Sequence, residues 1–378
     1  MTPASTALHD RLPHAGTRGL LDLGGSALPV ELDDALSRLY GNIHSTPAHL
    51  RIYGGLDEVN AVYVARDHEA LSAVLLLRDD GRRLRVINEG MRLEAAALED
   101  FARHAFAARP HLSAIEFNAV EAPPLTIGFP VQQAICTADM PLALPPDADT
   151  YLASLGKNMR RNLRRYMDRL LQLHPSFRFE ILEREAISPA DARAVIDLNR
   201  ARIAGKQQAY SIDDEEERIL ALLGERGMAG IGRIDGRVCC GALGYRVGGR
   251  YFFKIIGHDP QYNPCSLGIL CCYLMIRACI ERGCSEFNFM WNEYEYKYAL
   301  GARRRDLQRV VIYRSRLHQL AQGRLAAGLA LAGARHRAAA LLEPGARLDE
   351  LPAGARATAH LLRTMRAVKR GLAFRRAT

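Results

Sequence analysis

The chain has 378 residues, of which 48% are hydrophobic and 25% are charged. A chain of this length and composition can bury two hydrophobic cores, which excludes an intrinsically disordered protein. It shows no N-terminal secretion signal, and its longest uncharged apolar run near the end, 325–334, is too short to span a bilayer, so we expect a cytoplasmic protein.

The first part of the chain contains strand patterns and one long helix pattern. The helix is expected over 93–109, and Asp79-Asp80-Gly81 reads as a turn between two strands. The strands are expected near 61–65, 71–78, 82–88, 113–118 and 132–140.

A proline-rich segment, 141–149, separates this part from the next. After it, the stretch 151–173 has apolar residues at alternating spacings of three and four, which predicts a helix with one apolar face. Its opposite face is basic. Such a face is either simply solvated or able to meet an anionic ligand at the border of a groove, and the pattern alone leaves both interpretations open.

The second part repeats the order of the first. Glu116-Phe117-Asn118 reappears as Glu286-Phe287-Asn288, and a helix pattern begins at Ser266. Its strands are expected near 229–233, 238–247, 250–257, 286–290 and 307–313. We therefore predict an α+β fold with two lobes in tandem, each a mixed, mostly antiparallel sheet flanked by helices. The expected division is a first lobe over 1–145, a second lobe over 146–315 and a helical tail over 316–378.

The start of the second helix pattern has the features of an anion site. The segment 258–265 carries two prolines and an asparagine and must be a loop. From Gly268 to Arg282 nearly every residue is apolar, and Gly283 ends the helix, which predicts a buried helix with a fixed N-terminus. The free N–H groups and the dipole at this end suit a pyrophosphate, and Gly268 allows close approach. An ordinary capped core helix is the alternative.

A polar aromatic cluster follows the strand 286–290. It alternates four aromatic residues with four polar ones, Trp291-Asn292-Glu293-Tyr294-Glu295-Tyr296-Lys297-Tyr298. Each acid, phenol and ammonium needs a partner when it is buried, so such a segment after a core strand is more often a site than filler. Lysine is also scarce: only five of the 51 basic residues are lysines, and three of these, Lys254 and Lys297 included, fall in the candidate site segments.

Together these segments resemble the GNAT-fold acyltransferases of the FemAB/CelD-like family. The resemblance covers 151–313 well and the first 145 residues in outline. It rests on the loop with Ser266-Leu267-Gly268, the long apolar helix, the strand with Phe287 and Phe289 after Gly283, and the run from Glu295 to Ala302. The chain departs from the family where Leu267 replaces a proline and Asn288 replaces an aspartate, which argues against a carboxylate role at position 288.

The resemblance implies a donor site and a catalytic cluster. We expect Lys297 to stabilise an oxyanion or a phosphate, Glu293 or Glu295 to accept a proton, and Tyr298 or Tyr296 to act as the acid. The expected donor-binding residues are Gly257, Asn263, Ser266, Leu267 and Gly268. The expected substrate-binding residues are Asn158, Arg161, Arg165, Arg202, Lys206, Trp291 and Asn292, with 199–210 as a flap over the site. The first lobe lacks the aromatic cluster and is expected to form one wall of the acceptor groove.

The predicted function is transfer of an acyl group, acetyl above all, from acyl-CoA to an amine or hydroxyl of a small molecule or saccharide, without a covalent enzyme intermediate. One alternative keeps the fold but takes aminoacyl-tRNA or an acyl carrier protein as the donor. The lack of an inserted helical hairpin favours CoA or a carrier protein. Another alternative is an inactive protein that binds carbohydrate or a carrier protein. No metal site is expected, because the eight cysteines show no ligand spacing and suit buried free thiols.

The positive charge is concentrated in the tail. Residues 314–378 contain thirteen Lys and Arg against three Asp and Glu, a net charge of +10, whereas the whole chain has a net charge of +9. Three interpretations stay open: a helical cap on the second lobe, a patch for the anionic surface of the inner membrane, and a dock for an acidic carrier protein. Nucleic acid is not an expected partner, except tRNA in the alternative above.

Overall fold

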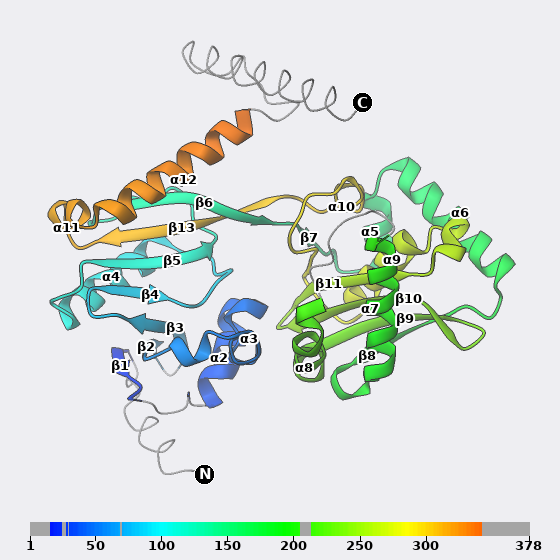
Figure 1. Cartoon of the computed structure of the whole chain (residues 1–378), viewed down its shortest axis with the longest axis horizontal. Helices are drawn as coiled ribbons and strands as arrows, with labels where there is room; N and C mark the ends of the chain where they lie inside the picture. Colours follow the sequence, from blue (N-terminus) through cyan, green and yellow to red (C-terminus); the bar gives the residue numbers. More distant parts are fainter. Residues whose placement is uncertain (1–15, 25–27, 29, 69, 205–212, 342–378) are drawn as a thin grey trace.

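The computed structural model describes residues 16–24, 28, 30–68, 70–204 and 213–341, which form two lobes side by side (Figure 1). Of the expected flap over 199–210, residues 199–204 form the end of a helix, while 205–210, with Lys206, and the basic positions from Arg363 to Arg376 lie outside the described residues. Short 3-10 helices connect several elements: η1 (Ile43–Ser45), η2 (Leu56–Glu58), η3 (Arg184–Ala186), η4 (Asp213–Glu215) and η5 (Pro260–Cys265).

The first lobe is built on a seven-stranded sheet in the order β1-β2-β3-β4-β5-β13-β6. All neighbours are antiparallel except β4 and β5, which are parallel. The strands are β1 (Arg18–Asp22), β2 (Ala61–Asp67), β3 (Ala70–Asp79), β4 (Arg83–Val86), β5 (Ala114–Val120), β13 (Arg305–Tyr313) and β6 (Val131–Asp139).

Helices cover both faces of this sheet because its strands are apolar on both sides. Along β2, Tyr63 packs in the core under α4 (Ala95–Ala108), whereas Val62 and Val64 pack in the core under α2 (Val30–Tyr40). This alternation follows from the period of two along a strand. The short helix α3 (Pro47–Tyr53) lies on the side of the first lobe that faces the second (Figure 1).

The second lobe is built on a six-stranded sheet in the order β7-β12-β11-β10-β9-β8, in which β11 and β12 are the parallel pair. One face is covered by α9 (Leu267–Glu281), α5 (Ala148–Ser154) and α6 (Lys157–Leu173), and the other by α7 (Pro189–Ala204) and α8 (Glu216–Arg226). The strands are β7 (Pro141–Ala143), β8 (Arg178–Glu183), β9 (Gly227–Ile234), β10 (Arg237–Val247), β11 (Arg250–His258) and β12 (Glu286–Asn288).

The predicted repeat and the α+β class are confirmed. In the first lobe three antiparallel strands, β2, β3 and β4, are followed by α4 and by β5 parallel to β4. In the second lobe β9, β10 and β11 are followed by α9 and by β12 parallel to β11. The repeated Glu-Phe-Asn words lie on the equivalent strands β5 and β12.

Two predictions about the chain path are wrong. The strand expected to close the second lobe, β13, lies in the first sheet between β5 and β6, where Val310 and Ile312 pack in the first core. In return β7, which follows β6 after Met140, joins the second sheet beside β12. The helix expected over 151–173 is two helices, because Leu155 is extended and α6 starts after Gly156. Leu173, expected on the apolar face, is 54% exposed.

The described part of the tail packs on the first lobe. It does not pack on the second lobe, where the cap interpretation placed it. Helices α11 (Arg316–Ala321) and α12 (Gly323–Leu341) follow β13, and α12 runs along β6 and β13 (Figure 1). Leu329 packs there with Ala134, Val311 and Tyr313. In the part of the chain that the structure describes, no helix is both long and apolar enough to cross a membrane.

Because β13 separates β5 from β6, the first lobe depends on a strand that comes after the whole second lobe in the sequence. We expect a chain of residues 1–304 to lose cooperative thermal unfolding of the first lobe, since Val310 and Ile312 leave a gap in its core. A matched chain of residues 1–322 keeps β13 and loses only α12 and the residues after it, so it should melt cooperatively at a lower temperature. Calorimetry of the two chains checks this, and equal melting curves would contradict it.

Candidate active site

The two parallel strands of the second sheet separate soon after they begin. β12 pairs with β11 only from Arg250 to Phe252, so beyond that point the edge of β11 that faces β12 has no neighbouring strand. The pairing of β11 with β10 also shifts at Lys254, which is the extra residue of a β-bulge. A bulge leaves one residue out of the ladder and bends the strand. Unpaired backbone groups therefore line a gap that starts near Lys254.

The N-terminus of α9 lies at the far end of this gap. Ser266 precedes the helix with a φ of 53°, in the left-handed region, and its hydroxyl makes no capping hydrogen bond. Its carbonyl accepts the N–H groups of Ile269 and Leu270. Among the described residues the N–H groups of Leu267 and Gly268 have no hydrogen-bond partner, so this end of the helix offers free donors and the positive end of its dipole.

A cavity of about 470 Å³ opens at this helix start. Arg202, near the C-terminus of α7, lines this cavity, and its buried Nε has no hydrogen-bond partner among the described residues. The cavity thus combines free helix N–H groups with an arginine donor, which suits an anionic ligand. Its lining residues are Arg202, Ile203, Ile256, His258, Asn263, Ser266, Gly268, Ile269, Cys272, Tyr294 and Tyr296.

Asn263, Ser266 and Gly268 of the predicted donor-binding set line this cavity, but Gly257 and Leu267 do not. A Cβ at Gly257 would overlap the carbonyl of Val195 and lie 3.0 Å from the nitrogen of Asn199, so this glycine lets α7 pack closely on β11. The side chain of Leu267 is buried in the core. Gly257 is therefore explained by the close packing of α7 on β11 and not by ligand binding.

Lys297 does not point into the cavity. Its side chain is 3% exposed, and its Nζ donates to the carbonyls of Phe289 at 3.0 Å, Trp291 at 2.5 Å and Asn292 at 2.8 Å. Burial lowers the pKa of this ammonium to about 8, so it is still charged at neutral pH. All three of its donors are occupied, which contradicts the predicted oxyanion role. Lys297 clamps the loop after β12, where Met290 and Asn292 have positive φ angles of 56° and 65°.

The other residues of the predicted catalytic cluster divide between the surface and the cavity. Glu293 accepts the hydroxyl of Tyr298 at 2.6 Å and pairs with Arg304, and all three groups are at the surface. Glu295 is exposed. Tyr296 is the predicted acid that lines the cavity, and burial raises the pKa of its phenol well above the usual value. This phenol keeps its proton at neutral pH and can donate it.

Cys272 is the thiol that lines the cavity, and it is not poised as a nucleophile. Burial raises its pKa to about 12, and the cations of Lys297 and Arg202 only partly offset this effect. The thiol is therefore protonated at neutral pH, whereas a nucleophilic cysteine needs its thiolate. This agrees with the predicted transfer without a covalent enzyme intermediate.

The predicted substrate-binding residues are dispersed. Asn158, Arg161 and Arg165 are exposed on α6, where the two arginines border an open depression formed by α6 alone. Arg202 lines the donor cavity, as described above. Trp291, 38% exposed, lies outside that cavity with its ring 5.5 Å from the imidazole of His44. Asn292 is exposed, and its carbonyl binds Lys297.

The sequence analysis missed a polar cluster at the junction of the lobes, next to the bulge. His44 and His49 from the first lobe have ring centroids 4.7 Å apart, and His49 stacks on Tyr53. Lys254 of the bulge donates to Glu215 at 2.8 Å. Burial, followed by nearby charges that include Lys254, lowers the pKa of His44 to about 3 and that of His49 to about 4, so both are neutral at pH 7. The scarcity of lysine indicated Lys254, but no motif indicates His44 or His49.

The two histidines also line a second cavity, of about 400 Å³, between α3 and the ends of β4 and β5. Glu89 borders this cavity, accepts a hydrogen bond from Asn118 at 2.6 Å, and has its pKa raised by burial. It forms no ion pair with a described residue, unlike Glu116, which pairs with Arg309 and Arg83. A neutral base and an acid without a cationic partner therefore face the same space, close to Trp291 and the bulge.

Comparison with known proteins agrees with this fold. Residues 157–298 match the model of the acetyltransferase (GNAT) domain, so the second lobe contains a GNAT-type acyltransferase domain. The structure of FemX aligns with 80% of this chain and 99% of its own at a TM-score of 0.51 and 12% identity, which shows a shared two-lobed fold.

Two weaker structural likenesses were also found. A protein of unknown function from Bacteroides thetaiotaomicron aligns with 75% of this chain and 91% of its own, at 12% identity and a TM-score of 0.44. A tandem GNAT protein from the clavulanic acid biosynthesis pathway aligns with 78% of this chain and 98% of its own, at 12% identity and a TM-score of 0.34. No curated protein sequence matches the chain at a significant level.

The clamp formed by Lys297 predicts a loss of stability when the ammonium is removed. Lys297→Met keeps the length of the stem but leaves three carbonyls without their donor, so the free energy of unfolding should fall by roughly 2–4 kcal/mol. Lys157→Met, at an exposed position, is the matched control and should change it by less than about 0.5 kcal/mol. Urea denaturation measures both. If the two variants are equally stable, the three hydrogen bonds are not a clamp.

The buried histidines predict a stability that falls in acid. The folded-state pKa of His49, about 4, is below its ordinary value of 6.5, so the unfolded chain binds more protons between these pH values and stability declines as the pH falls through them. Between pH 7 and pH 4, the free energy of unfolding of His49→Gln should fall by roughly 1–3 kcal/mol less than that of the wild type. His111→Gln, at an exposed position, should follow the wild type. If the melting temperatures of all three proteins fall equally between pH 7 and pH 4, His49 is not a buried neutral histidine.

Proposed function

We propose that the protein transfers an acyl group from acyl-CoA to an amine or hydroxyl of a small molecule or saccharide, as an acyltransferase of the FemAB/CelD-like branch. The observation that carries this proposal is the cavity at the start of α9, which is lined by the helix start with its two free N–H groups, by Arg202 and by residues of β11 beyond its pairing with β12. The match of residues 157–298 to the GNAT domain supports the class of reaction.

The residues around this cavity fit the donor. The N–H groups of Leu267 and Gly268 and the guanidinium of Arg202 would hold its pyrophosphate, since helix N-termini and arginine both favour phosphate. Ser266 adds a hydroxyl that is free of capping duty. The open edge of β11 can hydrogen-bond the amide groups of an extended arm in the way that a sheet edge accepts an added strand. Acyl-CoA supplies the activated thioester, and the protein supplies its orientation.

The acceptor would enter from the opposite end of the gap, through the cavity beside His44 and His49. The carboxylate of Glu89 would attract an amine in its ammonium form, and this pairing favours N-acylation. The carboxylate of Glu89 can also accept the proton that the attacking nitrogen or oxygen loses, whereas His44 and His49, with pKa values of about 3 and about 4, are weak bases and would only hydrogen-bond the acceptor as neutral imidazoles. Tyr296, protonated at the donor cavity, would return a proton to the leaving thiolate.

In this arrangement the acceptor and the donor would enter the same gap from its two ends. The bulge at Lys254 and the histidine cluster lie at one end of the gap, and His258 and α9 lie at the other end, about 13 Å further along β11 at 3.3 Å per residue. Holding the two reactants in line supplies much of the rate, and no covalent enzyme intermediate is required. An aminoacyl-tRNA or acyl carrier protein could present its thioester or ester to the same gap, and it would then bind outside the donor cavity.

Binding of CoA tests the proposal. Gly268→Glu places bulk and negative charge among the free N–H groups, and even its Cβ would lie 3.1 Å from the ring of His258. CoA should raise the melting temperature of the wild type but not that of Gly268→Glu. The matched control is Gly224→Glu on α8, where a Cβ meets open space, and CoA should still protect it.

Calorimetric titration with CoA gives the same comparison at fixed temperature. The circular dichroism spectrum of Gly268→Glu must match that of the wild type for the loss to be assigned to the cavity. Equal CoA affinity in the wild type and Gly268→Glu would place the donor elsewhere. Binding of an acyl carrier protein without binding of CoA would favour the alternative donor.

A further inference from the structure

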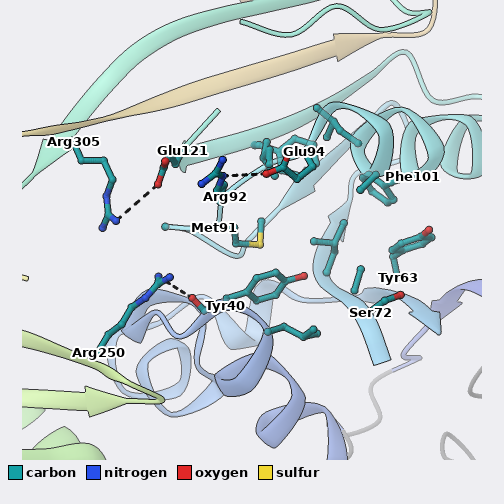
Figure 2. A pocket seen from close by; sticks show the side chains of 18 of the residues that line it. Tyr40, Tyr63, Ser72, Met91, Arg92, Glu94, Phe101, Glu121, Arg250 and Arg305 are labelled. Atoms are coloured by element: carbon teal, nitrogen blue, oxygen red, sulfur yellow. Dashed lines mark hydrogen bonds and ion pairs between the residues drawn. The ribbon is translucent and has the colours of Figure 1, made fainter. Parts of the chain in front are cut away.

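A separate cavity of about 570 Å³ lies at the junction of the two lobes (Figure 2). Its walls in the first lobe come from α2, β2, β3 and the start of α4, and the second lobe adds Arg250 and Glu286 from the first residues of β11 and β12. His258, on the donor cavity, is at the other end of β11, about 26 Å from Arg250 at 3.3 Å per residue. A ligand in this cavity would therefore not occupy the donor site.

The cavity exists because β4 is short. β4 ends at Val86, so the edge of β3 from Ser72 to Leu75 has no strand beside it. The hydroxyl of Tyr40 takes the place of a strand there: it donates to the carbonyl of Val74 at 2.9 Å and accepts its N–H at 3.2 Å. The backbone at this wall is thus satisfied from within the protein, and the wall facing the cavity is apolar.

The polar and apolar linings lie on different sides of the cavity. Figure 2 shows Tyr63 and Phe101 at one side and the side chains of Arg92, Arg250 and Arg305 toward the other. Leu75, Met91 and Leu98 extend the apolar side. A ligand that fills this space needs an apolar part and a polar head, and the volume is in the range of cavities that bind small molecules.

The charge of the polar head can be inferred from the charged side chains of the lining that still have hydrogen-bonding groups without a partner. Arg305 donates to Asp139 and Glu286, and Arg92 donates to Glu94 at 3.0 Å. Arg250 donates only to the carbonyl of Tyr40, at 3.2 Å, and has no carboxylate partner among the described residues. Of the acids that line the cavity, Glu94 pairs with Arg92, Glu286 pairs with Arg305, and Glu121 lies 3.9 Å from Arg305 (Figure 2). The group with free capacity is therefore a cation, which recognises an anion.

We propose that this cavity is a second ligand site, for an acyl chain that ends in a carboxylate or a phosphate. The chain packs between Tyr63, Leu98 and Phe101, and the anionic head binds the guanidinium of Arg250. Because Arg250 belongs to the second lobe and the apolar walls belong to the first, the bound ligand bridges the two lobes. Carboxylate and phosphate share the recognition chemistry, and their affinities distinguish the natural source.

The test uses the full-length protein and four probes with the same chain: decanoate, decyl phosphate, decanol and decylammonium, each below its micelle concentration. Calorimetric titration should show that the two anions bind at least about tenfold more tightly than the alcohol or the cation. Of the two anions, the tighter binder identifies the head group. Equal affinity for all four probes would overturn the proposal, because it would indicate nonspecific binding to apolar surface.

Variants locate the site. Arg250→Gln keeps a donor for the carbonyl of Tyr40 but removes the charge, so it should weaken binding of the anions about tenfold and leave decanol unchanged. Arg161→Gln, an exposed arginine on α6, should bind the anions as the wild type does. Ala73→Trp fills the cavity and should abolish binding of all chains, while a circular dichroism spectrum that matches the wild type shows that it is folded. Should Ala73→Trp fail to fold, the two arginine variants decide.

A result in which Arg250→Gln and Arg161→Gln bind the anions equally would remove the ligand from this cavity. Gly268→Glu, altered in the donor cavity, should keep the affinity for decanoate and decyl phosphate. If it instead loses them, the probes bind at the donor cavity, and the second site does not exist. These outcomes are independent of CoA binding, so failure of this proposal is distinct from failure of the proposed function.

Discussion

The guanidinium of Arg305 holds the two sheets together, and the geometry of both sites depends on it. Arg305 begins β13 and donates to Asp139 at the end of β6, at 3.0 and 2.7 Å, and to Glu286 at the start of β12, at 3.1 Å. Asn288 adds an amide donor to Asp139 at 2.6 Å. These half-buried charges are satisfied only when β6, β12 and β13 meet, so the position where β12 leaves β11 is fixed from the first lobe. Arg305 and Glu286 also line the interlobe cavity, and the gap beside β11 begins where its pairing with β12 ends.

Much of the fold could be predicted because its signals are local. Alternating and helical periodicity located the strands of both lobes except β1, β7 and β8, and the repeated Glu-Phe-Asn word aligned β5 with β12. The sheet to which β13 belongs could not be predicted, because a strand of alternating residues fits any open edge. Its place is decided by contacts of Val310 and Ile312 with a core formed about 200 residues earlier in the chain, although consecutive elements usually lie next to each other. The break before α6 depends on a single extended residue, Leu155, within a continuous apolar pattern.

The candidate site also has some features that could be predicted from the sequence and others that could not. The start of α9 could be predicted because helix termini are defined by the residues around them, and Ser266 and Gly268 line the cavity as expected. The role of Lys297 could not, since its partners are three carbonyls presented by the local fold of its own loop. His44 and His49 were missed because they come from the other lobe and belong to no motif. Their neutral state results from burial between the lobes, which no local pattern contains.

The two lobes share one architecture but differ in charge at the equivalent helix start. In the second lobe Ser266 and Gly268 leave N–H groups free, and Arg202 adds a donor, so an anion is favoured there. In the first lobe Glu94 occupies the N-cap of α4 without a side-chain capping hydrogen bond, and its carboxylate pairs with Arg92. The gap of the first lobe is lined by apolar side chains and completed by Arg250 of the second lobe. The equivalent helix starts of the two lobes therefore differ, because the second presents free N–H groups and the first presents a carboxylate paired with an arginine.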